Sequence, residues 1–132
     1  MDVAIPTFRP DGRLDQIIRR LGKQSCPVRH IWLLNTRSGD FPEKYEKMEK
    51  VTVKQIEPEE FDHGATRDMA FSLSDAEYMV FMTQDAVPAD RRMIEELLKP
   101  LLSSDEVGIS YARQLPAKDC GVIERYTRSF NY

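Results

Sequence analysis

The sequence reads Phe61-Asp62-His63-Gly64-Ala65-Thr66-Arg67-Asp68, and soon afterwards the apolar run Tyr78-Met79-Val80-Phe81-Met82 leads into Thr83-Gln84-Asp85. The first stretch is typical of a charged helix start, and the second of a strand that ends in a carboxylate. Arg67 and Asp85 would converge where these elements meet. An arginine and a carboxylate at close range can hold an anionic diphosphate and the divalent metal that neutralises it. The two stretches therefore predict a nucleotide-sugar site.

Short β-rich runs alternate with helical patterns along the rest of the chain. This alternation is the signature of parallel strands joined by crossover helices. The predicted fold class is α/β, with a Rossmann-like, mostly parallel sheet and flanking helices. We expect strands at residues 3–7, 30–35, 51–56, 78–82 and 107–112, helices at residues 11–22, 64–73 and 89–102, and a short exposed charged helix within residues 43–50.

The composition describes one soluble domain that spans residues 1–132. A chain of 132 residues forms a single core, which buries roughly two thirds of the unfolded surface. Hydrophobic residues make up 41% and charged residues 31%, and the formal net charge is −3. A protein that binds nucleic acid neutralises phosphates with an excess of Lys and Arg. We therefore expect no nucleic-acid partner.

The location and redox state follow from what the sequence lacks. The start of the chain has no basic flank and no long apolar region, and no apolar run is long enough to span a membrane. We expect a cytoplasmic protein. Cys26 and Cys120 match no metal or redox spacing, so we expect two packing thiols and no disulfide.

Polar residues follow each of the first four expected strands. In an open α/β sheet, ligands bind beyond the carboxyl ends of the strands. One edge of the sheet would therefore collect all of these residues. They are Thr7-Phe8-Arg9-Pro10, Asn35-Thr36-Arg37-Ser38-Gly39-Asp40, residues 62–68, and Gln84-Asp85.

Across nearly its whole length, the chain resembles the nucleotide-binding half of the inverting family 2 glycosyltransferases, and within them the rhamnosyltransferase branch. Val3-Ala4-Ile5-Pro6-Thr7-Phe8 is similar to the family's opening strand and the turn that borders the nucleotide. Leu33-Leu34-Asn35-Thr36-Arg37-Ser38-Gly39-Asp40 is similar to the second-strand motif Asp-Asn-x-Ser-x-Asp, with Asn35 where the base-contacting Asp is usual. The resemblance implies the nucleotide-diphospho-sugar transferase fold, truncated to its N-terminal part.

The resemblance also implies the residues that bind the nucleotide. His63-Gly64-Ala65-Thr66-Arg67-Asp68 is similar to the family's His-Gly-x-x-Arg-Asn element, in which Arg67 would neutralise the diphosphate beside the amides of the helix start. Arg9 and His63 have alternative roles as a surface arginine and a structural hydrogen-bonding histidine. The amide of Asn35 both donates and accepts, which leaves uracil, thymine and guanine open as the base. The implied nucleotide-binding residues are Pro6, Thr7, Arg9, Asn35, Ser38, His63, Gly64, Arg67 and Gln84.

Thr83-Gln84-Asp85 stands where the family has its Asp-x-Asp metal motif, and only the last carboxylate is kept. Metal binding would then rest on Asp85, on waters and on diphosphate oxygens. This set suits Mg²⁺ or Mn²⁺, because such ions keep waters and bind substrate phosphates. The alternative role of Asp85 is to cap the following turn.

The implied activity is inverting transfer of a sugar from a nucleotide-diphospho-sugar to a glycan or lipid-linked acceptor. The donor would be dTDP- or UDP-linked, and its sugar rhamnosyl-like. The implied location is cytoplasmic and includes the inner face of the membrane. The family's catalytic base lies in its second half, and neither Asp119 nor Glu124 sits in a matching motif. We therefore expect a fragment that binds donor but transfers little sugar. Tyr126, Phe130 and Tyr132 would be exposed, which predicts self-association.

The turn after the first strand disfavours two other classes of protein. A receiver-like domain needs an acidic pair there, and Thr7-Phe8-Arg9-Pro10 contains none. A nucleotidyltransferase needs a Gly-rich basic loop at this place, and Gly12 alone does not make one. A non-catalytic nucleotide-binding domain of the same fold stays open as an alternative.

Overall fold

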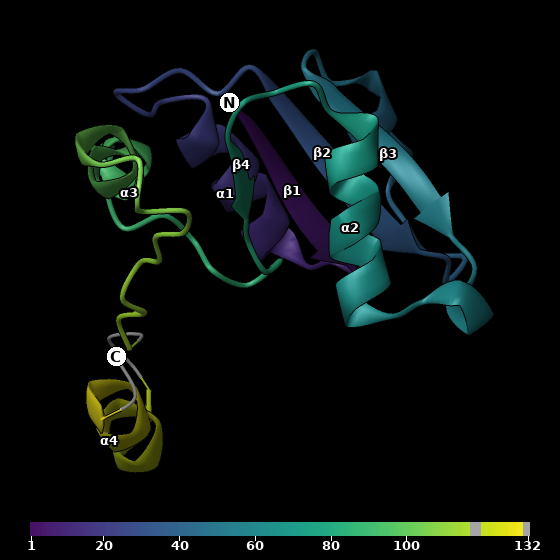
Figure 1. Cartoon of the computed structure of the whole chain (residues 1–132). Coiled ribbons are helices and arrows are strands. Elements are labelled where there is room, and N and C mark those ends of the chain that lie inside the picture. The colour runs from purple at the N-terminus through teal and green to yellow at the C-terminus, as the bar shows by residue number, and fades with distance from the viewer. Residues whose placement is uncertain (117–119, 131–132) are drawn as a thin grey trace.

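The computed structural model describes residues 1–116 and 120–130 of the chain. Four strands form one sheet in the order β3-β2-β1-β4, and every pairing is parallel (Figure 1). The expected Rossmann-like sheet is therefore confirmed. The elements are β1 (Asp2–Thr7), α1 (Gly12–Leu21), β2 (His30–Thr36), η1 (Glu43–Lys47), β3 (Val51–Ile56), η2 (Pro58–Glu60), α2 (His63–Leu73), β4 (Met79–Phe81), α3 (Met93–Ser103) and α4 (Val122–Phe130).

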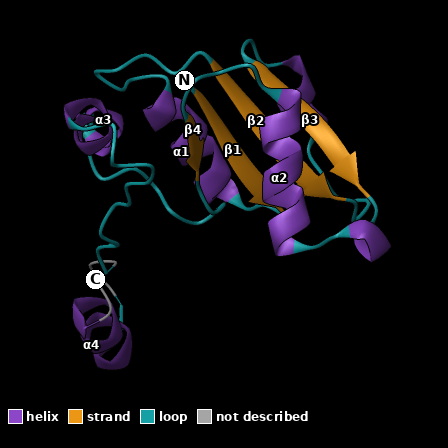
Figure 2. Cartoon of the chain, in the orientation of Figure 1, coloured by secondary structure: helices purple, strands orange, loops and turns teal. Residues whose placement is uncertain are grey.

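The sheet lies between α1 on one face and α2 on the other (Figure 2). Successive side chains of a strand point to opposite faces, so β1 contributes to two cores. Val3 and Ile5 pack with Leu14 of α1, whereas Ala4 packs with Ala70 of α2. Packing on both faces thus holds β1 and β2 in the centre of the sheet. It also fixes where the carboxyl ends of the two strands lie.

The two helices that flank the sheet begin at aspartate caps. Asp11 accepts a hydrogen bond from the Arg13 amide, and Asp62 accepts from the amides of Gly64 and Ala65 at 2.9 and 2.8 Å. An aspartate at this position satisfies amides that have no partner within the helix. Asp62 is therefore the cap of α2.

A buried ion pair joins the amino ends of the strands. Arg29 donates two hydrogen bonds to Asp2, at 2.9 and 2.8 Å, and the Ser74 hydroxyl donates a third at 2.6 Å. The Asp2 side chain is fully buried, and its pKa lies well below the usual range, chiefly because of the Arg29 hydrogen bonds. This network ties the start of β1 to the end of α2.

Two expected helices differ from the structure. Residues 43–47 form the expected short helix, but it is a 3₁₀ helix, and Tyr45 within it is buried, with its hydroxyl donating to Asp15 at 2.9 Å. The helix expected at 89–102 begins at Met93 instead. The turn before it is stabilised by the Asp90 carboxylate, which accepts from the Arg92 amide at 2.7 Å.

The prediction of a fifth strand at residues 107–112 is wrong. The segment follows α3 without joining the sheet, and Figure 2 draws it as loop. Within the described residues β4 is hydrogen-bonded to β1 alone. A strand-forming sequence needs a neighbouring strand to complete its hydrogen bonds, and this segment has none there.

The chain beyond α3 leads to α4, which lies apart from the sheet (Figure 1). Tyr126, on α4, is exposed as expected. The expectations for Asp119 and Tyr132, and for the side chains of Glu124 and Phe130, fall outside the described residues. None of the described helices is long and apolar enough to cross a membrane.

Candidate functional site at the carboxyl edge

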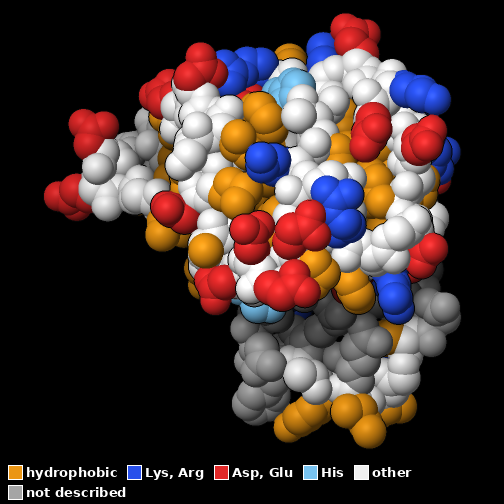
Figure 3. Space-filling view, turned by 90° about the vertical axis from the view of Figure 1, so that its right-hand side faces the viewer, with side chains coloured by type: hydrophobic (Ala, Val, Ile, Leu, Met, Phe, Trp, Pro, Cys, Tyr) orange, Lys and Arg blue, Asp and Glu red, His pale blue; other side chains and the backbone are white. Residues whose placement is uncertain are grey.

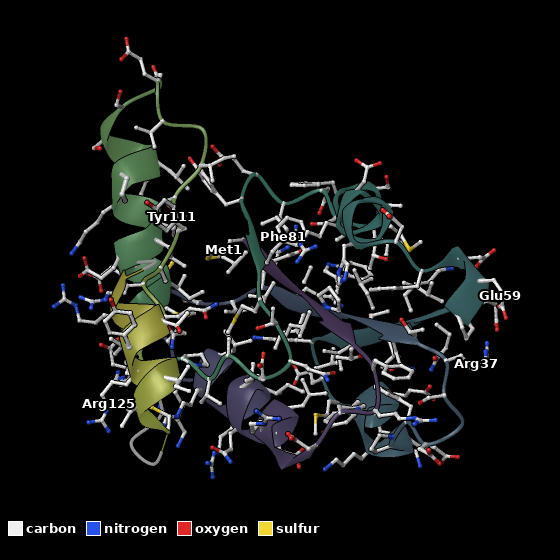
Figure 4. All side chains as sticks on the ribbon, turned by 90° about the horizontal axis from the view of Figure 1, so that it is seen from below. Met1, Arg37, Glu59, Phe81, Tyr111 and Arg125 are labelled. Atoms are coloured by element: carbon white, nitrogen blue, oxygen red, sulfur yellow. The ribbon has the colours of Figure 1, made fainter. Side chains whose placement is uncertain are left out.

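The carboxyl ends of the strands form one edge of the sheet, called here the carboxyl edge. Figure 4 views the molecule from this side, and it shows Arg37, in the turn after β2, near Glu59 of η2. The turns after β1, β2 and β4 and the first turn of α2 all meet the carboxyl edge, because all strands are parallel and α2 follows β3. The structure therefore brings the predicted site residues to one side of the molecule.

A buried hydrogen-bond chain crosses three strands at this edge. The Thr7 hydroxyl donates to Oδ1 of Asn35 at 3.1 Å, and Nδ2 of Asn35 donates to Oε1 of Gln55 at 2.8 Å. Asn35 is fully buried. Its side-chain amide thus holds Thr7 and Gln55 in place. Oδ1 can accept one further hydrogen bond, and Nδ2 can donate one more.

Gln84 joins the turn after β4 to the turn after β1. Its Oε1 accepts from the Phe8 amide at 2.8 Å, and its Nε2 donates to the Phe8 carbonyl at 3.0 Å. The next residue, Arg9, has a φ of 45°, and its guanidinium lies 5.2 Å from the centre of the Phe8 ring. The two hydrogen bonds fix a sharp turn that leaves the Phe8 ring 49% exposed.

The start of α2 carries a cation beside amides that are already capped, because those of Gly64 and Ala65 donate to Asp62. His63 and Gly64 are exposed, and the His63 ring packs edge-on against Phe61 with centroids 4.9 Å apart. Arg67 is half-buried one turn later, and its Nη1 donates to the His63 carbonyl at 2.9 Å. A helix N-terminus together with a guanidinium is a suitable environment for an anion.

The turn after β2 contains an unsatisfied hydroxyl. Oγ of Ser38 is buried and has no hydrogen-bond partner among the described residues. Its neighbour Arg37 is held by Glu57, whose Oε1 accepts from Nε at 2.8 Å. Ser38 can therefore donate to a ligand at this edge, whereas Arg37 serves to tie the turns after β2 and β3 together.

The predicted metal ligand Asp85 is exposed in the turn after β4. Arg13 lies near enough for the Asp85 charge to raise its pKa, although the hydrogen bond from Arg13 to Asp11 raises it more. No group of three or more His, Cys, Asp or Glu residues within residues 1–116 and 120–130 has the arrangement of a metal cage. A single exposed carboxylate fits Mg²⁺ or Mn²⁺ that arrives with diphosphate oxygens and waters.

Two side chains at this edge were not among the predicted site residues. They are Arg13, at the start of α1, and Phe8, in the turn after β1, whose ring is half-exposed. The position of Phe8 directly after a strand was a usable signal. The position of Arg13 near Asp85 depends on how α1 crosses the sheet, so the sequence pattern alone did not indicate it.

The parallel sheet, with polar turns gathered at its carboxyl edge, defines the class as an α/β domain of the kind in which ligands bind beyond the ends of the strands. The sequence model of glycosyl transferase family 2 matches residues 2–131, and the chain belongs to this family. Its sequence is 28% identical over 130 residues to the O-antigen chain rhamnosyltransferase WbaN of Salmonella anatum, and 27% identical to the O-antigen chain rhamnosyltransferase RfbN of Salmonella typhimurium. Each alignment covers 97% of this chain and 41% of the relative.

The fold is similar to that of a solved structure. TarS of S. aureus, residues 1–349, superposes with a TM-score of 0.60 at 22% identity, over 78% of this chain and 32% of that one. This likeness concerns the fold, and it confirms the predicted class. The chain thus spans about two fifths of the length of the curated relatives it matches.

Proposed function

We propose that this chain is the donor-binding, N-terminal part of an inverting glycosyltransferase that takes a rhamnosyl-like sugar from a nucleotide diphosphate. The observation that carries the proposal is the gathering of the turns after β1, β2 and β4 and of the start of α2 at the carboxyl edge of the parallel sheet, with Arg67 on α2 and Asp85 after β4. Membership of glycosyl transferase family 2 and the two O-antigen rhamnosyltransferase relatives support the class of reaction.

The diphosphate would bind at the start of α2. The guanidinium of Arg67 supplies the positive charge, whereas the amides of Gly64 and Ala65 are taken by Asp62. The positive charge favours a doubly charged anion over a neutral sugar. His63 would donate to the same phosphates from the first turn of the helix.

The nucleoside would lie over the turns after β1 and β2, next to Pro6 and Thr7. The exposed Phe8 ring offers a face on which a base can stack. Ser38 has a hydroxyl without a partner among the described residues, which can meet a ribose or base oxygen. Asn35 would act chiefly by holding Thr7, because its own side chain is buried. A dTDP or UDP donor is our preferred assignment.

A divalent metal would bind Asp85 together with the diphosphate and waters. When bound, Mg²⁺ or Mn²⁺ would neutralise charge on the leaving nucleotide. Gln84 would set the position of Asp85, because its side chain fastens the turn after β4 to the Phe8 backbone. Arg13, near Asp85, would compete with the metal when no diphosphate is present.

Transfer would be completed by residues outside this domain. The acceptor would be a growing glycan or a lipid-linked glycan, met at the cytoplasmic face of the membrane. The general base would be contributed by the part of the protein that corresponds to the remaining length of the curated relatives. The purified 132-residue chain would therefore bind donor nucleotide and transfer little sugar.

Calorimetric titration of the purified chain with UDP, dTDP and GDP, with and without Mn²⁺, tests this function. We expect one nucleotide to bind in a metal-dependent manner, and Asp85→Asn to remove the metal dependence. Asp105→Asn, an exposed aspartate after α3, is the matched control and should leave binding unchanged. Metal-independent binding in both variants would refute the role of Asp85, and absence of binding by all three nucleotides would refute the donor site.

A further inference from the structure

Three polar side chains occupy the same level of neighbouring strands at the carboxyl edge. Thr7 of β1 is paired with Asn35 of β2, and Asn35 is paired with Gln55 of β3. Side chains at one level of a sheet point to the same face. The hydrogen-bond chain from Thr7 through Asn35 to Gln55 therefore runs along one face of the sheet, and it ends on β3, at the side remote from β4.

Only the last member of this hydrogen-bond chain is accessible. Asn35 is fully buried and Thr7 is 3% exposed, whereas Gln55 is half-buried. The side chain of Asn35 therefore cannot reach a ligand that lies over the carboxyl edge. Such a ligand would meet the hydrogen-bond chain at Gln55 instead.

The direction of the hydrogen bonds determines which atom Gln55 presents. The Thr7 hydroxyl donates to Oδ1 of Asn35, so Nδ2 of Asn35 faces Gln55 and donates to its Oε1 at 2.8 Å. Nε2 of Gln55 forms no hydrogen bond with another described residue. An amide nitrogen donates and does not accept. Gln55 therefore offers hydrogen-bond donors to a ligand.

A second group that can donate lies beyond the same strand ends. The Arg37 amide donates to the Ile56 carbonyl at 2.8 Å, which fastens the turn after β2 to the end of β3. Ser38 follows directly, and its buried hydroxyl has no partner within residues 1–116 and 120–130. Figure 3 views the molecule from the side of β3, where acidic and basic side chains are interspersed. Hydrogen-bond donors, rather than an excess of one charge, thus characterise this part of the carboxyl edge.

We propose that Gln55 is a specificity-determining residue of the donor site, where its Nε2 donates to a carbonyl oxygen of the base. This inference rests on the proposed function and adds the class of base. Uracil, thymine and guanine carry a carbonyl oxygen where cytosine and adenine carry an amino group. An amino group is itself a donor, so it would leave Nε2 without an acceptor. The site would therefore select keto bases over amino bases.

Asn35 is a positioning residue in this arrangement. Its oxygen is held by Thr7 and its nitrogen faces Gln55, so it keeps Oε1 of Gln55 inward and Nε2 outward. An aspartate at position 35 would accept hydrogen bonds at both ends. Gln55 would then turn Nε2 toward the carboxylate and present Oε1 to the base. One substitution behind Gln55 would thus convert the presented donor into an acceptor.

Calorimetric titration of the purified chain with matched nucleotide pairs tests the proposal. The pairs are UDP with CDP, dTDP with dCDP and GDP with ADP, all with Mn²⁺. In at least one pair we expect the keto nucleotide to bind more tightly by about tenfold or more. Gln55→Glu keeps an acceptor for Asn35 but replaces the donor by an oxygen, so it should reverse the preference within that pair. Asn35→Asp should lower the same ratio of affinities, and circular dichroism checks that each variant is folded.

Gln16→Glu, at an exposed position of α1, is the matched control, because it adds the same charge outside the hydrogen-bond chain. It should leave the keto-to-amino ratio unchanged. Equal binding of both members of every pair would overturn the role of Gln55 and leave the donor site standing. So would a ratio that Gln55→Glu fails to lower, or one that Gln16→Glu lowers as strongly. Absence of binding by all six nucleotides would instead refute the donor site, and this proposal with it.

Discussion

The side-chain amide of Gln84 makes both of its hydrogen bonds to the backbone of Phe8, accepting from its amide at 2.8 Å and donating to its carbonyl at 3.0 Å. These two residues lie 76 positions apart in the sequence. The contact joins the turn that carries the proposed metal ligand to the turn that borders the proposed nucleoside. The geometry of the site therefore depends on a residue that need not touch the ligand.

Replacement of Gln84 tests this link. Gln84→Glu keeps an acceptor for the Phe8 amide but places a carboxylate against the Phe8 carbonyl, so one hydrogen bond is lost and a repulsion is gained. We expect a loss of about 1 kcal/mol in the free energy of unfolding and weaker nucleotide binding. Urea unfolding and calorimetry measure the two effects. Gln16→Glu, at an exposed position of α1, should change neither.

Arg67 should contribute to nucleotide affinity through its charge. Arg67→Gln is expected to weaken binding of the nucleoside diphosphate by roughly tenfold or more, because a charge-assisted hydrogen bond contributes about 1.5–3 kcal/mol. The difference should shrink at high salt. Arg19→Gln, on the exposed side of α1, is the control with the same change of net charge. Equal losses in the two variants would point to a general field effect instead.

Asn35 should matter for stability as well as for binding. In Asn35→Leu the Thr7 hydroxyl loses its buried acceptor and Gln55 loses its donor. We expect the free energy of unfolding to fall by about 2 kcal/mol, since a buried polar group is left without a partner. Thermal unfolding measures the loss. Asn35→Asp keeps an acceptor for Thr7 and should lose less, and an unchanged melting temperature in Asn35→Leu would contradict the network.

Acid should unfold the chain partly through Asp2. Its pKa in the folded state lies below the ordinary value of 3.8, chiefly because of the hydrogen bonds from Arg29. Its contribution to stability is therefore complete above that value, and is lost as the pH falls below it towards the folded-state pKa. Asp2→Asn should lower stability at pH 7 and flatten the dependence between about pH 4 and pH 2. Asp75→Asn removes the exposed partner of Arg29, which also lowers the pKa of Asp75, and it should flatten the dependence less than Asp2→Asn does.

Local patterns were sufficient where each element depends on its own residues. The apolar run Val3-Ala4-Ile5 predicts a strand, and Asp62 before a helical pattern predicts the start of α2. Both are present in the structure. Residues 107–112 show the opposite case. Their composition favours a strand, but a ladder requires a partner, and composition carries no information on whether one is available.

The site was only partly predictable for the same reason. That polar residues follow the strands could be read from the sequence, and parallel strands bring such residues to one edge. The roles of individual side chains could not be read from the sequence. Asn35 was predicted to contact the base, a role that the structure leaves as a proposal, while its amide is already engaged by Thr7 and Gln55. Tyr45 lies in a charged run, yet it is buried because α1 supplies Asp15 as its partner.

The sequence by itself determined the α/β class, the limits of the first four strands to within about two residues and the resemblance to family 2 glycosyltransferases, because periodicity, caps and motifs are properties of neighbouring residues. The tertiary structure alone decided the strand order, the pairing of Gln84 with Phe8 and the burial of Asp2 beside Arg29. Each of these joins residues distant in sequence. Their energies depend on where the packed core places them, and no local pattern encodes that placement.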